Sequence, residues 1–429
     1  MCDLKKSLKN LRQIVLVALL AAVPAAGQAQ FGYMVNASNA NTITITNYTG
    51  LGGIVNIPAT INGLTVTGIG SPGFSFNFNV TGVTMPGAIT SIGGAFDACK
   101  NLTNLTIPSN VTSIADDAFY QCHSLQSIIV PGGATNIGVE VFAWCISLTN
   151  AILMDGITSI PGGMFAGCTN LVSLTFPSNI TSMGEDALNG TALNSFIIPS
   201  TMTIIDDEAF EGTDLMTNVV VPPTVTSISE FAFNYSGITS ISIPEGVTNI
   251  GYLAFNQCGL TNVTIPGSAQ FLDDSIFSGC ESLAYVTIAA GISNITYDML
   301  SYCTNLSGVM FQGNAPNVTG FSTDGPTFAG DPKAVAYYLP GTTGWSNTYQ
   351  GIPAVEWNPS VAPATMHNGQ FGVTVTGNTN IPIQLQACTN LSCPVWAPLT
   401  NVSLTNGSFY YSEPVQSNSP SRFYRVVFP

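Results

Sequence analysis

The chain has 429 residues, of which 45% are hydrophobic and only 7% are charged, and its formal net charge is −15. This length allows several structural units, and the apolar content excludes a disordered chain. The negative charge argues against nucleic acid and anionic membrane surfaces as partners. It favours neutral glycans, basic proteins or cations instead.

Residues 1–29 have the pattern of a secretory signal peptide. Four of the eight Lys and Arg residues precede the apolar run Ile14–Val23, and Gly27–Ala29 supplies small residues for cleavage. The run is too short for a stable membrane span, so we expect none in the mature chain. The pattern predicts a protein that is exported, either secreted or held at the cell surface.

Residues 30–70 are expected to form an N-terminal cap with the first strands. Thr42–Thr46 reads T-I-T-I-T, the alternation of a half-buried strand, and Gly50–Gly53 reads as a turn. A cap is expected here because an open sheet edge invites aggregation.

Residues 71–311 consist of a repeat of 22 or 23 residues, typified by NLTNLTIPSNVTSIADDAFYQC at Asn101–Cys122. Self-similarity at such a period indicates a solenoid. The aromatic residue of the A-F pair recurs most regularly, and we call this series the Phe ladder. Its members are Phe74, Phe96, Phe119, Phe142, Phe165, Leu188, Phe210, Phe233, Phe255, Phe277 and Leu300.

Each repeat predicts two short strands. L-T-x-L-T-I alternates apolar residues with threonine, proline then ends the strand, and V-T-S-I starts a second one. The following polar pair is expected to cap a short helical turn that carries the Phe and, three residues later, a Cys on its inner side. One repeat buries too few side chains to fold alone, so stacked repeats must share a core. The predicted fold class is mainly β.

These I-P, V-T-x-I and A-F-x-x-C elements resemble the BspA-like leucine-rich repeat, over roughly residues 41–312. The resemblance implies a leucine-rich repeat solenoid of secreted or surface-attached bacterial proteins. Some members of that family act as adhesins or binding surfaces, so it also implies a recognition role.

The period ends after Phe311. Residues 312–359 are predicted to cap the solenoid, with Trp345 and Trp357 covering the core of the last repeat. Residues 360–365 read as a Pro/Ala linker. Residues 366–429 then contain four strand-like runs separated by turn signals, which predicts a small antiparallel β-sandwich or meander. Anchoring is one role that its position suggests.

Seven of the ten cysteines lie three residues after the Phe ladder, and Thr or Ser takes this place in three repeats. A metal or redox site would not tolerate that exchange, so we expect buried free thiols that bond to backbone carbonyls. Cys388 and Cys393 lie off the ladder, around a turn in a small module, and are a candidate disulfide.

Two sets of residues are candidates for binding. Glu185, Asp207 and Glu230 share one position in successive repeats; a solvated acidic face explains them, and a weak Ca²⁺ site or a patch for a basic partner is the alternative. The second set comprises three aromatic residues two places after the Phe ladder, which serve either local packing or contact with a ligand: Trp144, Tyr235 and Tyr302.

No nucleophile–base, zinc, phosphate-loop or dinucleotide motif occurs in the sequence, so no cofactor and no enzyme activity are predicted. The leading hypothesis is a non-enzymatic recognition or adhesion protein whose solenoid face binds a protein or glycan. The alternative is a structural stalk or envelope component anchored by its C-terminal module. A hydrolase would need a site hidden in that module, where His367, Arg422 and Arg425 make a poor one.

Overall fold

The computed structural model describes residues 29–320, 326–367, 370–414 and 422–429. The predicted signal peptide therefore lies outside the described residues, apart from its last position. The chain divides into two compact units. The first runs to Thr217 and includes Phe231–Gly237, and the second comprises Asn218–Glu230 and Ile238–Pro429.

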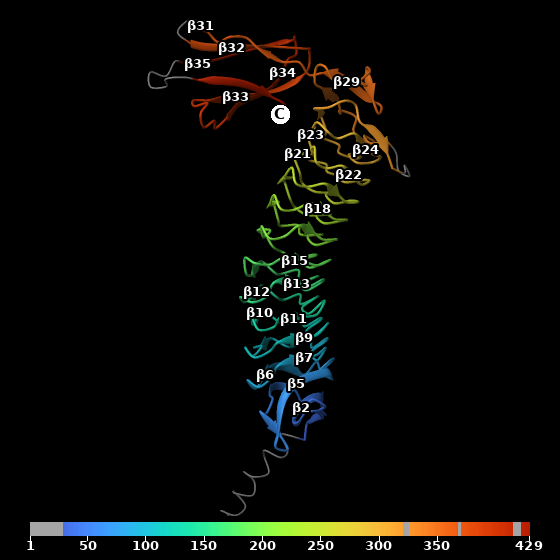
Figure 1. Ribbon diagram of the computed structural model, residues 1–429, viewed down its shortest axis with the longest axis vertical. Helices are drawn as coiled ribbons and strands as arrows, with labels where there is room; N and C mark the ends of the chain where they lie inside the picture. The colour runs from blue at the N-terminus through green and yellow to red at the C-terminus, as the bar shows by residue number, and fades with distance from the viewer. Residues whose placement is uncertain (1–28, 321–325, 368–369, 415–421) are drawn as a thin grey trace, which may run out of the picture. The chain divides into compact units, whose positions relative to one another are not determined.

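In the first unit each repeat forms one coil of a solenoid, and successive coils stack with their strands parallel (Figure 1). One row of strands arises from the L-T-x-L-T-I segments: β3 (Gly53–Asn56), β6 (Val80–Thr84), β8 (Asn104–Leu105), β10 (Ser127–Val130), β12 (Asn150–Leu153) and β14 (Ser173–Thr175). The V-T-S-I segments give the other row: β5 (Leu64–Gly73), β7 (Ser91–Ile92), β9 (Ser113–Ile114), β11 (Asn136–Ile137), β13 (Ser159–Ile160), β15 (Ser182–Met183) and β16 (Ile204–Ile205).

Each strand pairs with the equivalent strand one repeat further along the chain. Ser127 lies opposite Asn150, and Ser113 lies opposite Asn136, each pair being 23 residues apart. Equivalent residues are therefore neighbours in space, at the ~4.8 Å spacing of paired strands. In the Phe ladder, consecutive rings from Phe74 to Phe165 stack with centroids 5.0–5.7 Å apart and planes within 12°.

The N-terminal cap also follows from the sequence. β1 (Phe31–Asn36) and β2 (Asn39–Tyr48) form an antiparallel hairpin, β2 pairs in parallel with β5, and β4 (Thr60–Ile61) pairs with β5. Ile43 and Ile45 of the T-I-T-I-T run are fully buried. Tyr48 stacks on Phe74 with centroids 4.9 Å apart, so the cap extends the aromatic stack to its end.

The predicted short helical turn is wrong: the described residues contain no helix, and so none that is long and apolar enough to cross a membrane. The residues two before and two after the ladder Phe have positive φ, as at Asp117 (56°) and Gln121 (54°). A right-handed helix requires negative φ. The N–H groups of Asp117, Phe119 and Gln121 instead donate to carbonyls of the next coil at 2.9–3.1 Å.

In the second unit the two rows of parallel strands continue, and each row pairs within itself. The first row is β17 (Asn218–Val220), β19 (Ser240–Ser242), β21 (Asn262–Ile265), β23 (Tyr285–Ile288), β25 (Gly308–Phe311), β27 (Ala336–Tyr338) and β29 (Ile352–Glu356), with β28 (Thr348–Tyr349) antiparallel to β29. The second row is β18 (Ser227–Ile228), β20 (Asn249–Ile250), β22 (Phe271–Leu272), β24 (Asn294–Thr296) and β26 (Asn317–Thr319).

The end of the chain forms two antiparallel sheets, as predicted. One contains β30 (Ser360–Val361), β31 (Thr365–His367), β32 (Gln370–Thr376) and β35 (Ser408–Pro414). The other contains β33 (Pro382–Cys388), β34 (Ala397–Ser403) and β36 (Phe423–Val427). The expected linker at 360–365 instead begins with β30, which pairs with β32.

The solenoid end and this module share one core, because apolar side chains of both pack together. Met310 and Tyr337 of the solenoid join one buried cluster with Val373 and Leu385 of the module. Of the two predicted capping tryptophans, Trp345 does cover the last repeat, with its ring 5.0 Å from Phe311. Trp357 packs against the shared cluster instead and donates through Nε1 to the Pro382 carbonyl at 2.8 Å.

The seven ladder cysteines are buried and form no disulfide, as predicted. Six donate through Sγ to the ladder Phe carbonyl of the preceding coil, as Cys122 does to Phe96 at 3.3 Å. Thr191 takes the position by donating to the Leu188 carbonyl of its own coil at 2.9 Å. Burial raises the pKa of the Cys145 thiol well above its usual range, which disfavours the reactive thiolate.

Cys388 and Cys393 are not joined by a disulfide in the structure. Cys388 is buried at the end of β33, whereas Cys393 is exposed in the loop that follows. The two side chains lie in opposite environments, which sequence spacing alone does not reveal.

Thiol reactivity tests this arrangement. In the mature chain from residue 30, we expect iodoacetamide to label one thiol, Cys393, under native conditions, because the other eight described thiols are buried. All nine should react in denaturant. Intact-mass analysis counts the labels, and a native disulfide would appear as two thiols that react only after reduction.

The Phe ladder is tested by Phe142→Ala, which should lower the free energy of unfolding by about 3–5 kcal/mol because it leaves a cavity between two stacked rings. Phe142→Leu should cost less than about 1.5 kcal/mol, since Leu188 fills the same position naturally. Phe76→Ala is the matched control, because Phe76 is exposed. Urea unfolding measures all three, and equal losses for Phe142→Ala and Phe76→Ala would contradict the ladder's role.

Candidate binding groove at Trp144

The position two residues after the ladder Phe adopts the left-handed region in almost every coil. Glycine, which accepts this conformation without strain, stands there in several coils: Gly167, Gly190, Gly212 and Gly279. The predicted aromatic candidates occupy the same position with φ of 54–60°: Trp144, Tyr235 and Tyr302. A bulky residue in this region is uncommon, and the stacked coil imposes it.

Trp144 lies over a glycine of the next coil. A Cβ atom built on Gly167 would stand 2.8 Å from Cδ2 of the Trp144 indole, so any larger residue at 167 would displace the ring. The indole is nevertheless 49% exposed. The missing side chain of Gly167 therefore lets the ring rest against the coil while much of its surface stays open to solvent.

The coil that follows Trp144 has almost no outward side chains. Its sequence, P-G-G-M-F-A-G-C at residues 161–168, places glycine at both left-handed positions, Gly163 (60°) and Gly167 (68°). Gly162 and Ala166 are the other outward positions, while Met164 and Phe165 are buried. We call residues 161–168 the glycine coil.

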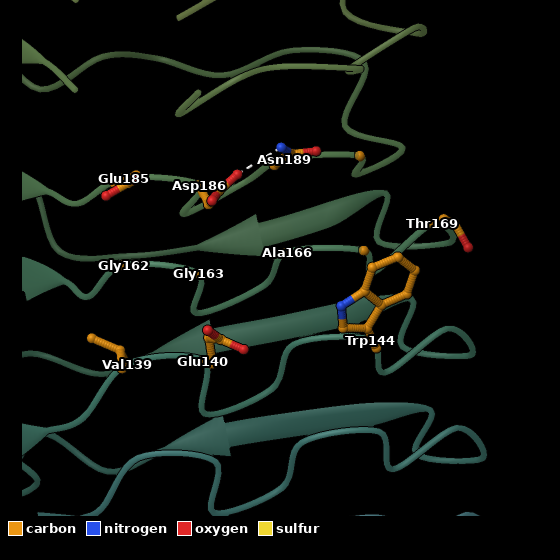
Figure 2. A pocket seen from close by; sticks show the side chains of 12 residues that line it. Val139, Glu140, Trp144, Gly162, Gly163, Ala166, Thr169, Glu185, Asp186 and Asn189 are labelled. Carbon is orange, nitrogen blue, oxygen red and sulfur yellow. Dashed lines mark hydrogen bonds between the residues drawn. The ribbon is translucent and has the colours of Figure 1, made fainter. Parts of the chain in front are cut away.

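An open groove of about 570 Å³ lies along the glycine coil. Figure 2 shows its two walls, one formed by Val139, Glu140 and Trp144 of the preceding coil and the other by Glu185, Asp186 and Asn189 of the following coil. We call this the Trp144 groove. It arises because a coil whose outward positions are glycine and alanine stands between two coils that carry larger side chains there.

The walls of the Trp144 groove are acidic. Burial, followed by the negative charges of Asp117 and Asp186, raises the pKa of the Glu140 carboxyl above its ordinary value. Asn189 donates through Nδ2 to Asp186 Oδ1 at 2.6 Å, which fixes that carboxylate on the wall. The groove thus combines an indole with three carboxylates.

Only two of the predicted binding residues line the groove. They are Trp144 and Glu185, the latter being one of the three acids that share a repeat position. Tyr302, in the second unit, is 54% exposed and lies over Gly330, where an added Cβ would be 2.9 Å from the ring. The sequence reasoning missed Gly162, Gly163 and Gly167; their joint occurrence in one repeat was the available signal.

The three acids considered for a Ca²⁺ site do not form a cluster of metal ligands. Within the part of the chain that the structure describes, no group of three or more His, Cys, Asp or Glu side chains is placed to hold a metal ion. Glu185, Asp207 and Glu230 therefore do not form such a group. Equivalent positions in neighbouring coils align carboxylates in a row, whereas Ca²⁺ needs six to eight oxygens around one point.

Comparison with known proteins identifies the repeats. A family model described as the BspA type leucine rich repeat region matches residues 93–216 and 203–322, in six copies, which together span more than half of the chain. The chain belongs to this family. No curated protein matches the chain.

Several solved bacterial structures are similar to this BspA-type protein. A leucine rich cell surface protein from Faecalibacterium prausnitzii is 26% identical, with 66% of this chain and 94% of that chain covered and a TM-score of 0.46. A leucine-rich repeat protein from Bacteroides ovatus is 18% identical, with 77% and 98% covered and a TM-score of 0.49. The pneumococcal vaccine antigen PcpA is 16% identical, with 73% and 92% covered and a TM-score of 0.48.

A second acidic feature of the BspA-type repeats adjoins the groove. Asn189 also donates to Glu211 Oε2 at 3.3 Å, and Asn234 donates to Glu211 Oε1 at 2.7 Å. The hydrogen bond between Glu208 and Glu211, together with burial and the charge of Asp186, raises the pKa of Glu208 to about 8. Glu208 therefore holds a proton in the folded protein near neutral pH.

This proton links stability to pH. The ordinary pKa of Glu208 is 4.5, so between pH 4.5 and about 8 the folded chain binds a proton that the unfolded chain has released. We expect the melting temperature to fall as pH rises from 5.5 to 8.5, and Glu208→Gln to reduce this fall, because it keeps a neutral donor beside Glu211.

Thermal scans across that range measure the effect, with Asp155→Asn as the control because Asp155 is an exposed acid of the same unit. If the melting temperature of Glu208→Gln fell with pH as steeply as that of the wild type, the raised pKa of Glu208 would be contradicted.

Proposed function

We propose that this BspA-type leucine-rich repeat protein is an exported recognition protein, acting at the cell surface or after secretion, that binds a protein or glycan without catalysing a reaction. The observation that carries the proposal is the Trp144 groove. It presents a half-exposed indole, held against Gly167, beside fixed polar groups. Binding sites of this kind combine an aromatic contact surface with a few polar groups that set orientation.

The exposure of Trp144 supports a role beyond packing. A non-glycine residue in the left-handed region is strained by about 1–2 kcal/mol, and glycine occupies the equivalent position in the next coils. Half of the indole remains in water, so its burial returns only part of that cost. Because Gln121 and other non-glycine residues adopt the same φ in other coils, the exposure of the indole beside the groove, rather than the strain, favours a contact role.

The lack of catalysis and the export rest on separate features. The lack of catalysis is proposed because the groove is an open coil surface and the sequence contains no nucleophile–base, zinc, phosphate-loop or dinucleotide motif. Export is supported by the signal-peptide pattern at residues 1–29. The low charge of 7% and the acidic balance suit a protein that meets basic or neutral partners.

The test is an array of extracellular-matrix proteins, other host proteins and glycans, probed with the mature chain from residue 30. We expect at least one ligand to bind and Trp144→Gly to weaken it by about tenfold or more, because buried tryptophans dominate such interfaces. Tyr302→Gly, at the same repeat position in the second unit, should leave that ligand's affinity unchanged.

The variant Trp144→Gly is expected to fold, since glycine stands at this position in neighbouring coils, and its melting temperature should equal or exceed the wild-type value. If the wild-type chain binds nothing on the array and yet stays attached to the cell surface, the stalk role replaces recognition.

A further inference from the structure

The Trp144 groove contains hydrogen-bond acceptors with negative charge and no cation among its lining residues that neutralises them. Carboxylates of Glu140, Glu185 and Asp186 line it, and its twelve lining residues include no Lys, Arg or His. Lys100 is the only Lys or Arg among the described residues of the first unit, and its ammonium group lies over the Phe78 ring at 5.9 Å from the centroid. The groove's negative charge is therefore not neutralised from within that unit.

Few side-chain N–H or O–H groups of the walls are free to donate to a ligand. The amide of Asn189 donates to Asp186 and to the Glu208–Glu211 pair. The remaining side-chain donors of the lining are the Trp144 indole N–H and the Thr169 hydroxyl. A ligand that enters the groove must consequently bring hydrogen-bond donors, and a positively charged donor gains most from three carboxylates.

The molecule shows elsewhere how it binds such a group. In the second unit the Arg425 guanidinium carbon lies 4.4 Å from the centroid of the Trp396 ring, and Arg425 Nε donates to Gln386 Oε1 at 2.8 Å. The arrangement pairs a planar cation on an indole with an oxygen at its edge. The Trp144 groove supplies the same two elements, an indole and edge acceptors, without the cation.

We propose that the Trp144 groove binds an arginine side chain of a basic polypeptide, with the guanidinium stacked on the Trp144 indole and its N–H groups donating to Glu140 and Asp186. This inference rests on the proposed recognition function and names its ligand class. The glycine coil gives the room: the backbones of the two wall coils are roughly 10 Å apart, two strand spacings of ~4.8 Å, and the groove along it has a volume of about 570 Å³.

Arginine fits the groove better than lysine or a neutral sugar. A guanidinium stacks flat on an aromatic ring and directs its donors in the plane toward carboxylates, which a compact ammonium group cannot do. A neutral sugar can stack on Trp144 and donate hydroxyl groups to the carboxylates, but it leaves their negative charge unneutralised. Burial and then the charges of Asp117 and Asp186 raise the pKa of Glu140, and a bound cation offsets the charge contribution, which a neutral sugar does not.

The experiment uses the full mature chain and the capped peptide Gly-Gly-Arg-Gly-Gly. Binding is followed by the Trp144 indole N–H resonance, assigned by its loss in Trp144→Gly. We expect saturable shifts with the arginine peptide, about tenfold weaker binding of the lysine peptide, and no binding of the citrulline peptide, a neutral isostere, at the same concentration. Rising NaCl should weaken the arginine peptide further.

Two variants locate the charge. Glu140→Gln combined with Asp186→Asn should lower arginine affinity by about tenfold or more while keeping the side-chain shapes, and Asp155→Asn should leave it unchanged. Melting temperatures within a few degrees of wild type establish that both variants fold. For the doubly substituted chain, peptide affinity equal to that of the wild type would overturn the proposal.

Other outcomes separate this inference from the proposed function. Equal binding of the citrulline and arginine peptides overturns the arginine assignment. Methyl glycosides of glucose, galactose, mannose and N-acetylglucosamine are titrated in parallel; if one of them shifts the Trp144 resonance and the arginine peptide does not, the groove is a sugar site and recognition stands. If neither peptides nor glycosides shift it and the array yields no ligand, both proposals fail.

Discussion

The structure depends on in-register stacking of coils at the spacing of paired β-strands. Each coil donates its backbone hydrogen bonds to its neighbours in three places, through the two strand rows and through the turn that carries the ladder Phe. The aromatic rings stack at nearly the same spacing, with centroids 5.0–5.7 Å apart from Phe74 to Phe165. Backbone pairing and core packing therefore have one period, and a repeat of 22 or 23 residues satisfies both at once.

The same stacking explains which parts of the fold the sequence predicted. Positions that pack inward repeat with little change, so the Phe ladder, the strand rows and the ladder thiols were all visible as periodic residues. The helical turn was predicted wrongly because an acidic pair before A-F looks like a helix N-cap. Its backbone instead turns left-handed at residues such as Asp117 and Glu140, and nothing in an isolated Asp or Glu reveals the sign of φ.

The candidate site was only half visible for a related reason. Trp144 and Glu185 stand out in the sequence because they are residues that can make contacts. The groove between them exists because Gly162, Gly163 and Gly167 have no side chain and Ala166 has only a methyl group, and missing side chains show only when coils are compared position by position. The candidate disulfide between Cys388 and Cys393 was suggested by their short spacing in the sequence. In the structure, however, one thiol is buried and the other is exposed.

A solenoid can acquire a binding groove at small cost to its fold, because outward positions are nearly independent of the core. Glycine at the left-handed positions of residues 161–168 relieves backbone strain and removes side chains in the same step. The preceding coil then places the Trp144 indole over the opening, and backbone hydrogen bonds to the glycine coil hold Trp144 in its strained conformation. Trp144 donates its own backbone N–H to the Ala166 carbonyl at 2.7 Å, so the residue that carries the contact surface is also fixed to the floor of the groove.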